Sequence, residues 1–545
     1  MDALTGRPMR VGMISLGCAK NLVDAEIMLG SLARAGIEIT TDAALADVVI
    51  INTCSFIDAA QEESVDVILE TARARTVQDH PQGIVVAGCL PQRFRDELPK
   101  LLPEVDAFMG IDQIPAIGQI VRQAYARRTG NLAHLNSVNT RGNIQLVSPA
   151  EAAPALTPLK ATPTTQPDLD TPDSQLVQVS PRPVYIPDYA TPHFRLTPRH
   201  FAYLKTAEGC NHPCSFCVIP RIRGRHRSRA QADIVQEARQ LIAAGVKELN
   251  LISQDTTYYG LDLRPAQTKI AHSPERSSPA TNVPADGSPT LCSLLRELND
   301  LPGDFWIRLL YTHPAHWTEE LIQTIVDCPK VARYIDIPLQ HIHPVMLERM
   351  RRETSSQYIA DLLTSIRARI PGIALRTTFI VGFPGETESS FQTLLNFIQA
   401  MRFERLGVFT YSSEKGTRAA AMARKIPDRV KRRRLELAMT IQQPIARQAA
   451  AALVGQTLCV LVERQVSARD RQQTRVSSWE KQQLRGTGSS QGQPLRGPMM
   501  IARTQADAPD IDGRVYVRGR VAAGEFAQVK IIGHTDYDLV AVPAD

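Results

Sequence analysis

Hydrophobic residues in the first part of the chain gather in three short, nearly continuous runs. The runs are Arg10–Cys18, Ala46–Cys54 and Gly83–Cys89. Aliphatic runs of this length are typical of strands buried on both faces of a parallel sheet. The segments between them show the apolar spacing of amphipathic helices. This pattern predicts an N-terminal doubly wound parallel α/β domain over residues 1–135.

A longer alternation of strand-like and helix-like segments follows over residues 196–447. Six strand candidates in a row, each followed by a helical segment, predict a partial TIM-type (βα)6 barrel. In such barrels, functional side chains lie at the C-terminal ends of the strands. The strand candidates are Phe201–Thr206, Val246–Ile252, Trp306–Tyr311, Tyr334–Pro338, Ile373–Val381 and Arg405–Tyr411.

The end of the chain and three polar stretches have different patterns. Residues 452–545 contain short strand-like runs separated by glycines, which predicts a small C-terminal β-barrel. Residues 136–195 form a Pro-rich linker, with ten prolines between positions 149 and 192. Polar inserts cover about 264–290 and 465–498. Such compositions cannot bury a hydrophobic core, so we predict no regular structure for these three stretches.

Composition and charge exclude several classes of protein. The chain has 545 residues, with 62 Lys and Arg against 56 Asp and Glu, a net charge of +6. This mild balance does not by itself indicate a nucleic-acid binder. No apolar run approaches the length of a membrane span, and residues 1–10 lack the features of a secretory signal. We therefore expect a cytoplasmic protein with no membrane partner.

Three of the nine cysteines form a compact motif, Cys210-x3-Cys214-x2-Cys217, directly after the first predicted barrel strand. In a reducing compartment, clustered cysteines indicate metal binding or catalysis. Three thiolates leave one iron of a [4Fe–4S] cluster open to bind a small molecule. The alternative is a zinc loop, for which His212 is the nearest fourth ligand.

Three further cysteines, Cys18, Cys54 and Cys89, each end a predicted N-terminal strand. The carboxyl ends of parallel strands meet at one crevice, where ligands bind. The three thiolates would therefore converge and could hold a second cluster with one open iron. The alternative is three buried structural cysteines. The remaining Cys292, Cys328 and Cys459 lie in no motif.

The cysteine motif, with aromatic Phe216 before its last cysteine and a barrel after it, resembles the radical S-adenosylmethionine (SAM) superfamily. The segments Ser15–Asp24, Asn52–Ile57 and Gly88–Leu90 resemble the N-terminal domain of methylthiotransferases. That family joins this domain to a radical SAM barrel and a C-terminal TRAM β-barrel, in the order predicted here. The resemblance implies SAM and two [4Fe–4S] clusters, one held by Cys210, Cys214 and Cys217 and an auxiliary one by Cys18, Cys54 and Cys89.

Two branches of that family differ in substrate. The segments Gly17–Asp24, Leu196–Lys205 and Ala506–Gly513 resemble the branch that modifies an aspartate of ribosomal protein uS12. The branch that modifies a tRNA adenosine has Gln-Met-Asn after the first cysteine, where this chain has Ala19-Lys20-Asn21. Residues 501–545 carry five basic and seven acidic side chains. That balance suits a basic ribosomal protein better than tRNA phosphates, so tRNA is the alternative substrate.

The resemblance also implies a mechanism. One SAM methylates a sulfur at the auxiliary cluster, and a second is reduced at the barrel cluster, with an electron donor such as flavodoxin or ferredoxin. The resulting radical removes a hydrogen from the aspartate β-carbon, which then takes the methylthio group. Two other classes stay open: a non-catalytic iron–sulfur ribosome-assembly factor, and a radical enzyme of another type.

Six residues at or near predicted barrel strand ends are candidates for SAM contact. A structural role is the alternative for Arg376, which could pair with a barrel acid, and for two neighbours of the candidates: Asp255 could cap a turn, and His341 could be structural. The alternating arginines from Arg221 to Arg229 could bind substrate or rRNA, or form salt bridges. The chain has Arg352-Glu353 where the family has Arg-Pro. The six candidates are Phe216, Ser253, Gln254, Gln340, Arg376 and Gly382.

Overall fold

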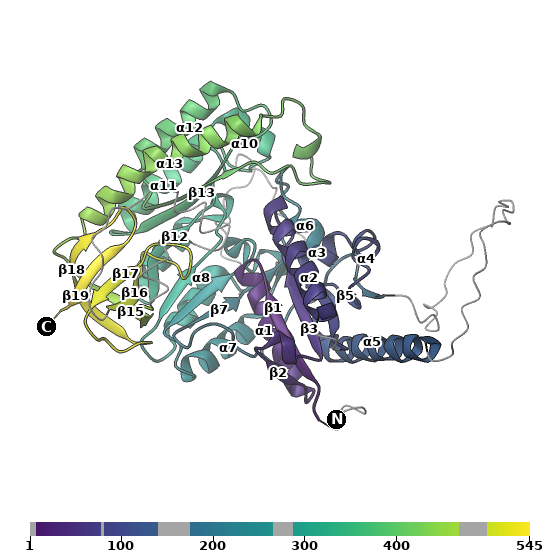
Figure 1. Cartoon of the computed structure of the whole chain (residues 1–545). Helices are drawn as coiled ribbons and strands as arrows, with labels where there is room; N and C mark the ends of the chain where they lie inside the picture. Colours follow the sequence, from purple (N-terminus) through teal and green to yellow (C-terminus); the bar gives the residue numbers. More distant parts are fainter. Residues whose placement is uncertain (1–6, 78–80, 140–174, 265–286, 468–498, 545) are drawn as a thin grey trace.

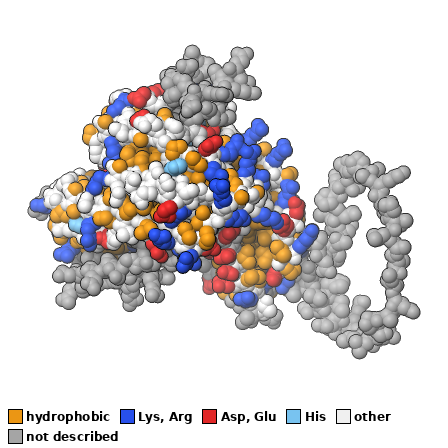
Figure 2. All heavy atoms as spheres, turned by 90° about the horizontal axis from the view of Figure 1, so that it is seen from above, with side chains coloured by type: hydrophobic (Ala, Val, Ile, Leu, Met, Phe, Trp, Pro, Cys, Tyr) orange, Lys and Arg blue, Asp and Glu red, His pale blue; other side chains and the backbone are white. Residues whose placement is uncertain are grey.

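The computed structural model describes residues 7–77, 81–139, 175–264, 287–467 and 499–544. An N-terminal α/β unit and a small C-terminal barrel lie against different sides of a central half-open barrel (Figure 1). Basic and acidic side chains are interspersed on the face shown in Figure 2, in keeping with the small net charge. No helix in the described part of the chain is long and apolar enough to cross a membrane.

The N-terminal unit is a six-stranded parallel sheet in the order β2-β1-β3-β4-β5-β6, with helices on both faces. Alternate residues of β3 point to opposite faces: Val48 and Ile50 pack in the cluster with α1 and α5, and Val49 and Ile51 pack in the cluster with α2. The prediction of a doubly wound sheet is thus confirmed. Its elements are β1 (Arg10–Ser15), α1 (Ala19–Arg34), β2 (Glu38–Thr40), β3 (Val48–Thr53), α2 (Asp58–Val77), β4 (Gly83–Gly88), α3 (Cys89–Arg93), α4 (Leu98–Leu101), β5 (Ala107–Met109), α5 (Ile117–Asn139) and β6 (Leu176–Gln178).

Strand β6 corrects the prediction that residues 136–195 form only a linker. It pairs in parallel with β5, with Leu176 opposite Ala107. The side chain of Gln175 anchors it by donating to the carbonyls of Leu102 and Val105, at 2.8 and 3.0 Å. A three-residue edge strand needs few apolar residues, so composition did not reveal it. Residues 140–174, 265–286 and 468–498, which hold most of the predicted polar stretches, lie outside the described residues.

The central unit is a row of six parallel strands in sequence order, β7 to β14, which confirms the partial TIM-type barrel. A short antiparallel pair, β8 (Ala207–Glu208) with β9 (Arg227–Ser228), follows the first strand and flanks the cysteine loop. The strands are β7 (Phe201–Lys205), β10 (Glu248–Ile252), β11 (Trp306–Leu309), β12 (Val331–Asp336), β13 (Ala374–Val381) and β14 (Arg405–Thr410). The helices are α6 (Ile219–Ile222), α7 (Gln231–Ala243), α8 (Leu291–Asn299), α9 (Glu319–Asp327), α10 (Pro344–Met350), α11 (Ser356–Arg369), α12 (Glu388–Met401) and α13 (Asp428–Ala451).

The C-terminal unit is a closed five-stranded barrel, as predicted, in the order β15-β16-β17-β19-β18. Strand β16 was not among the predicted strands, because it directly follows the polar insert. The barrel strands are β15 (Thr457–Gln465), β16 (Met499–Thr504), β17 (Val515–Arg518), β18 (Phe526–His534) and β19 (Leu539–Pro543).

The loop after β16, residues 505–513, packs into the central barrel. The Tyr334 hydroxyl donates to Asp512 at 2.7 Å, and Arg405 pairs with Asp507, at 3.0 Å from its Nε. Ala508 joins the same buried cluster as Tyr334 and Leu310. These aspartates therefore neutralise barrel arginines. We interpreted the excess of acidic side chains in residues 501–545 as suited to a basic partner. Part of this excess instead serves contacts within the protein.

Candidate functional site

The three N-terminal cysteines lie at one edge of the sheet. Cys18 caps α1 after β1, Cys54 follows β3, and Cys89 begins α3 after β4. Because β1, β3 and β4 are parallel neighbours, these strand ends meet. The meeting is close: Gly17 has φ of +89°, and a Cβ added there would lie 2.7 Å from Cβ of Cys54. The structure thus brings together the three residues that the sequence placed at strand ends.

Two buried asparagines hold these loops, and sequence reasoning missed both. The Asn21 amide donates to the carbonyl of Thr53 at 2.8 Å, and its Oδ1 lies 3.4 Å from the Cys89 thiol. The Asn52 amide donates to the backbone carbonyl of Asn21 at 2.7 Å. Both asparagines have no exposed area, although Asn21 lies within helix α1. A polar side chain at a position of the helix that faces the core was the available signal.

The barrel cysteines follow β8 in a short loop. The Cys210 amide donates to the carbonyl of Gly224 at 3.1 Å, and the Cys217 amide to that of Cys214 at 3.3 Å. Burial, together with the charge of Cys214, raises the pKa of the Cys217 thiol to about 12. The Arg352 guanidinium lies 3.4 Å from the sulfur of Cys214 and donates toward it. Converging thiols with a cation beside them fit a cluster held by three cysteines.

His212 is not positioned as a fourth ligand with these cysteines. Its Nε2 lies 2.7 Å from Asp255, and its Nδ1 hydrogen-bonds Glu353. Burial lowers the pKa of His212, but the bonds to Asp255 and Glu353 outweigh it and raise the value to about 10. An imidazole held between two carboxylates cannot offer a lone pair to zinc. His212 is therefore not placed as the fourth ligand that the zinc interpretation needs, and Glu353 has a partner in the loop.

His212, Asp255, His313 and His316 also form a buried group whose ligand atoms lie within 4.8 Å of one another. Both His212 Nε2 and His316 Nδ1 hydrogen-bond the same Asp255 oxygen, at 2.7 and 2.8 Å. These two distances are shorter than the spacing of about 3.3 Å between neighbouring ligand atoms around a tetrahedral zinc ion. The group is thus a hydrogen-bonded network behind the cysteine loop.

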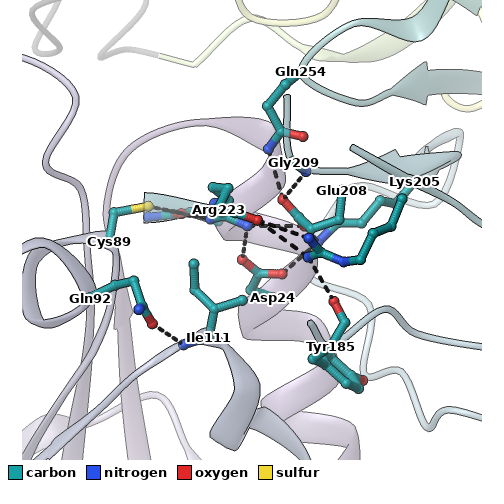
Figure 3. Close-up of polar contacts among 12 residues, drawn as sticks. Asp24, Cys89, Gln92, Ile111, Tyr185, Lys205, Glu208, Gly209, Arg223 and Gln254 are labelled. Carbon is teal, nitrogen blue, oxygen red and sulfur yellow. Dashed lines mark hydrogen bonds and ion pairs between the residues drawn. The ribbon is translucent and has the colours of Figure 1, made fainter. Parts of the chain in front are cut away.

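Arg223 lies between the two cysteine sites, and Figure 3 shows its contact with Cys89. It is 1% exposed; one guanidinium nitrogen pairs with Asp24 at 2.8 Å and with Glu208 at 3.1 Å. The other nitrogen lies 2.6 Å from Asn21 and 3.4 Å from the sulfur of Cys89. The next residue, Gly224, accepts the bond from Cys210.

Lys205 completes this cluster between the two units, with its ammonium 2.6 Å from Asp24 and 2.8 Å from Glu208. Arg229, further along the arginine run, pairs with Glu237 at 2.7 Å. Of the two roles considered for the arginine run, Arg223 and Arg229 therefore have the structural one, which is to form salt bridges. They are not free to meet a substrate.

The residues predicted to contact SAM lie around the mouth of the central barrel. Ser253 is fully buried after β10, and Gln254 donates to Glu208 at 2.8 Å. Phe216 packs edge-on against Phe383, beside Gly382. Gln340 follows β12 with φ of +73° and bridges to Phe379 of β13. Contact with SAM stays a prediction for all of these.

Arg376 pairs with Asp336 at 2.6 Å, as expected if its role is to pair with an acidic side chain of the barrel. Asp255 accepts a hydrogen bond from the Thr257 amide at 3.0 Å and so caps a turn, which is the structural role considered for it in the sequence analysis. His341 lies fully buried, 3.1 Å from Glu386.

Comparison with known proteins agrees with this arrangement. Family models match at residues 10–110 (uncharacterized protein family UPF0004), 204–398 (radical SAM superfamily) and 495–543 (TRAM domain). The chain is 48% identical over 537 residues to the ribosomal protein uS12 methylthiotransferase RimO of Opitutus terrae, covering 98% of this chain and 96% of that one. It is 45% identical to the same protein of Akkermansia muciniphila, covering 98% and 100%.

Among solved structures, the radical SAM methyltransferase TsrM of Kitasatospora setae matches with a TM-score of 0.45 and 14% identity, covering 84% of this chain and 78% of that one. The full-length sequence identities are far above this level. The chain belongs to the RimO family of ribosomal protein uS12 methylthiotransferases, with its UPF0004, radical SAM and TRAM parts in order.

Proposed function

We propose that this protein adds a methylthio group to the β-carbon of an aspartate of ribosomal protein uS12. The observation that carries the proposal is the pair of three-cysteine sites linked by Arg223, in a chain that matches uS12 methylthiotransferases over nearly its whole length. A ribosomal-protein substrate implies the cytoplasm as the place of action. The reducing electrons would come from a flavodoxin or ferredoxin.

The cysteines would supply the ligands for two [4Fe–4S] clusters, which together with SAM would provide radical formation and sulfur delivery. Cys210, Cys214 and Cys217 would hold the radical SAM cluster. Cys18, Cys54 and Cys89 would hold the auxiliary cluster. Around them, the guanidinium groups of Arg352 and Arg223 lie 3.4 Å from the sulfurs of Cys214 and Cys89, where each would donate to a cluster ligand. The target carbon carries an unactivated C–H bond, which a side-chain base cannot deprotonate at neutral pH, so a radical route fits the chemistry.

The test is anaerobic turnover with uS12 and tRNA as separate substrates, followed by mass spectrometry for the added methylthio group. Fully reconstituted protein should hold about eight irons per chain. We expect modified uS12 and unmodified tRNA. Modified tRNA with unmodified uS12 would contradict the proposal.

Cys54→Ala separates the two cysteine sites. The variant should still cleave SAM to 5′-deoxyadenosine under reductant, but it should transfer no methylthio group. Cys459→Ala is the control, because Cys459 lies on β15 of the C-terminal barrel. A radical enzyme of another type would keep full turnover in Cys54→Ala. A non-catalytic assembly factor would form no 5′-deoxyadenosine even as the unaltered protein.

A further inference from the structure

Lys20 differs from the other buried basic side chains in the described part of the chain. It is 7% exposed, and no ion pair or hydrogen bond of its ammonium is present there. A buried ammonium without a paired carboxylate is unfavourable, because burial removes the water that stabilises its charge. Eight other buried Lys and Arg side chains each pair with a carboxylate: Arg75 with Asp106, Lys205 and Arg223 with Asp24, Arg229 with Glu237, Arg308 and Arg503 with Glu248, Arg376 with Asp336, and Arg434 with Glu386.

Lys20 lies where the two units face each other. It belongs to the first turn of α1, two residues after Cys18. Its Nζ lies 2.8 Å from the centroid of the Tyr311 ring, which follows β11 at the mouth of the central barrel. A group bound at this ammonium would therefore lie between the Cys18 loop and the barrel strand ends.

No described carboxylate pairs with Lys20, and the first anionic neighbour that acts on it is the thiol of Cys18, two residues away. The Tyr311 ring attracts a cation through its quadrupole, which is weaker than a full negative charge. Tyr311 itself is fixed, with φ of +59° and its amide donating to Asp336 at 2.9 Å. Asp336 is already paired with Arg376 at 2.6 Å. The position thus has a built cation with which no described carboxylate pairs.

The substrate named above supplies one. The carboxylate of an aspartate is bonded to the β-carbon that receives the methylthio group, so an ammonium that holds the carboxylate also places that carbon. A lysine ammonium is a compact point charge with three donors, which suits a single carboxylate.

We propose that Lys20 binds the carboxylate of the substrate aspartate and positions its β-carbon between the two cysteine sites. This inference rests on the proposed function. SAM also carries a carboxylate, so the experiment distinguishes the two sources.

The experiment measures binding of a fluorescent uS12 peptide containing the target aspartate to the anaerobic holoenzyme with SAM, by anisotropy. Lys20→Met should weaken binding at least tenfold, and Lys20→Arg should recover part of it, because a charged hydrogen bond is lost and then partly restored. A peptide with asparagine at the target position should lose less than threefold on the same change. Lys415→Met is the control, because that side chain is 72% exposed and pairs with Glu97 on the surface.

Four results would overturn the assignment. Unchanged affinity of Lys20→Met for the aspartate peptide would remove its basis. Equal weakening of both peptides, or loss of iron from Lys20→Met and Lys20→Arg alike, would show a structural role. Loss of SAM binding with peptide affinity retained would assign Lys20 to the cofactor. Failure of the unaltered enzyme to bind and modify uS12 would refute the proposed function itself, which is a different outcome.

Discussion

Replacing Asp24 by asparagine tests the charge cluster that joins the N-terminal unit to the barrel. Asp24 pairs with Lys205 at 2.6 Å and with Arg223 at 2.8 Å, and its side chain is 4% exposed. The substitution keeps the shape of the side chain but leaves two buried cations with Glu208 alone. Breaking a buried pair in this way costs about 3–5 kcal/mol. Because Glu208 still contacts both cations, we expect the lower end, about 3 kcal/mol.

The assay is thermal unfolding of the anaerobic holoenzyme, with hydrogen exchange of α1 to assign the transition, since a chain of three units need not unfold in one step. A loss of about 3 kcal/mol corresponds to a fall in Tm of roughly 6–12 °C for a unit of this size. Glu38→Gln is the matched control: its pair with Arg10 is 40–50% exposed, so it should cost less than about 1 kcal/mol. If Asp24→Asn is no more destabilising than Glu38→Gln, the reasoning is refuted.

Two further changes test the packing and the charges away from this cluster. Gly17→Ala, at φ of +89° and against Cys54, should cost reconstituted protein about four of its eight irons, whereas Gly36→Ala, at φ of +72° in open space, should retain them; iron analysis that finds equal content would contradict the close approach. Burial raises the pKa of Glu463, but hydrogen bonds and charge from His200 and Arg503 outweigh it and lower the value to about 2. The carboxylate therefore stabilises the fold above its unfolded pKa of about 4.5, and this contribution is lost as the pH falls toward 2. Glu463→Gln should be less stable by roughly 3 kcal/mol at pH 7, and the gap should close below pH 4; a gap independent of pH would contradict the assignment.

The charged side chains show where sequence reasoning was least able to distinguish roles. Lys431 to Arg434 form a basic run that predicts the solvent face of a helix. The structure agrees for Arg432 and Arg433, which are exposed. Arg434 is buried instead and bonds the Glu386 carboxylate at 2.6 Å. The sequence of an arginine run does not show whether each side chain is solvated or pairs with a carboxylate far along the chain. Only the fold distinguishes these two cases.

Sequence alone determined the parts of this protein that depend on local pattern. Continuous aliphatic runs identified the buried strands, because a strand covered on both faces has no polar side. Cysteine spacing gave Cys210, Cys214 and Cys217, since neighbours in one loop converge whatever surrounds them. Strand-end position gave Cys18, Cys54 and Cys89, since parallel strands share one carboxyl edge.

Only the tertiary structure decided which polar groups face each other. Edge strand β6 depends on an anchor from Gln175 to carbonyls about 70 residues away. The contact of Arg223 with Cys89 and the lack of a paired carboxylate at Lys20 arise where the N-terminal unit meets the barrel. Pairing between such distant residues depends on how the units pack, and packing is set by shape and burial across the whole interface. That information is absent from any local stretch of sequence.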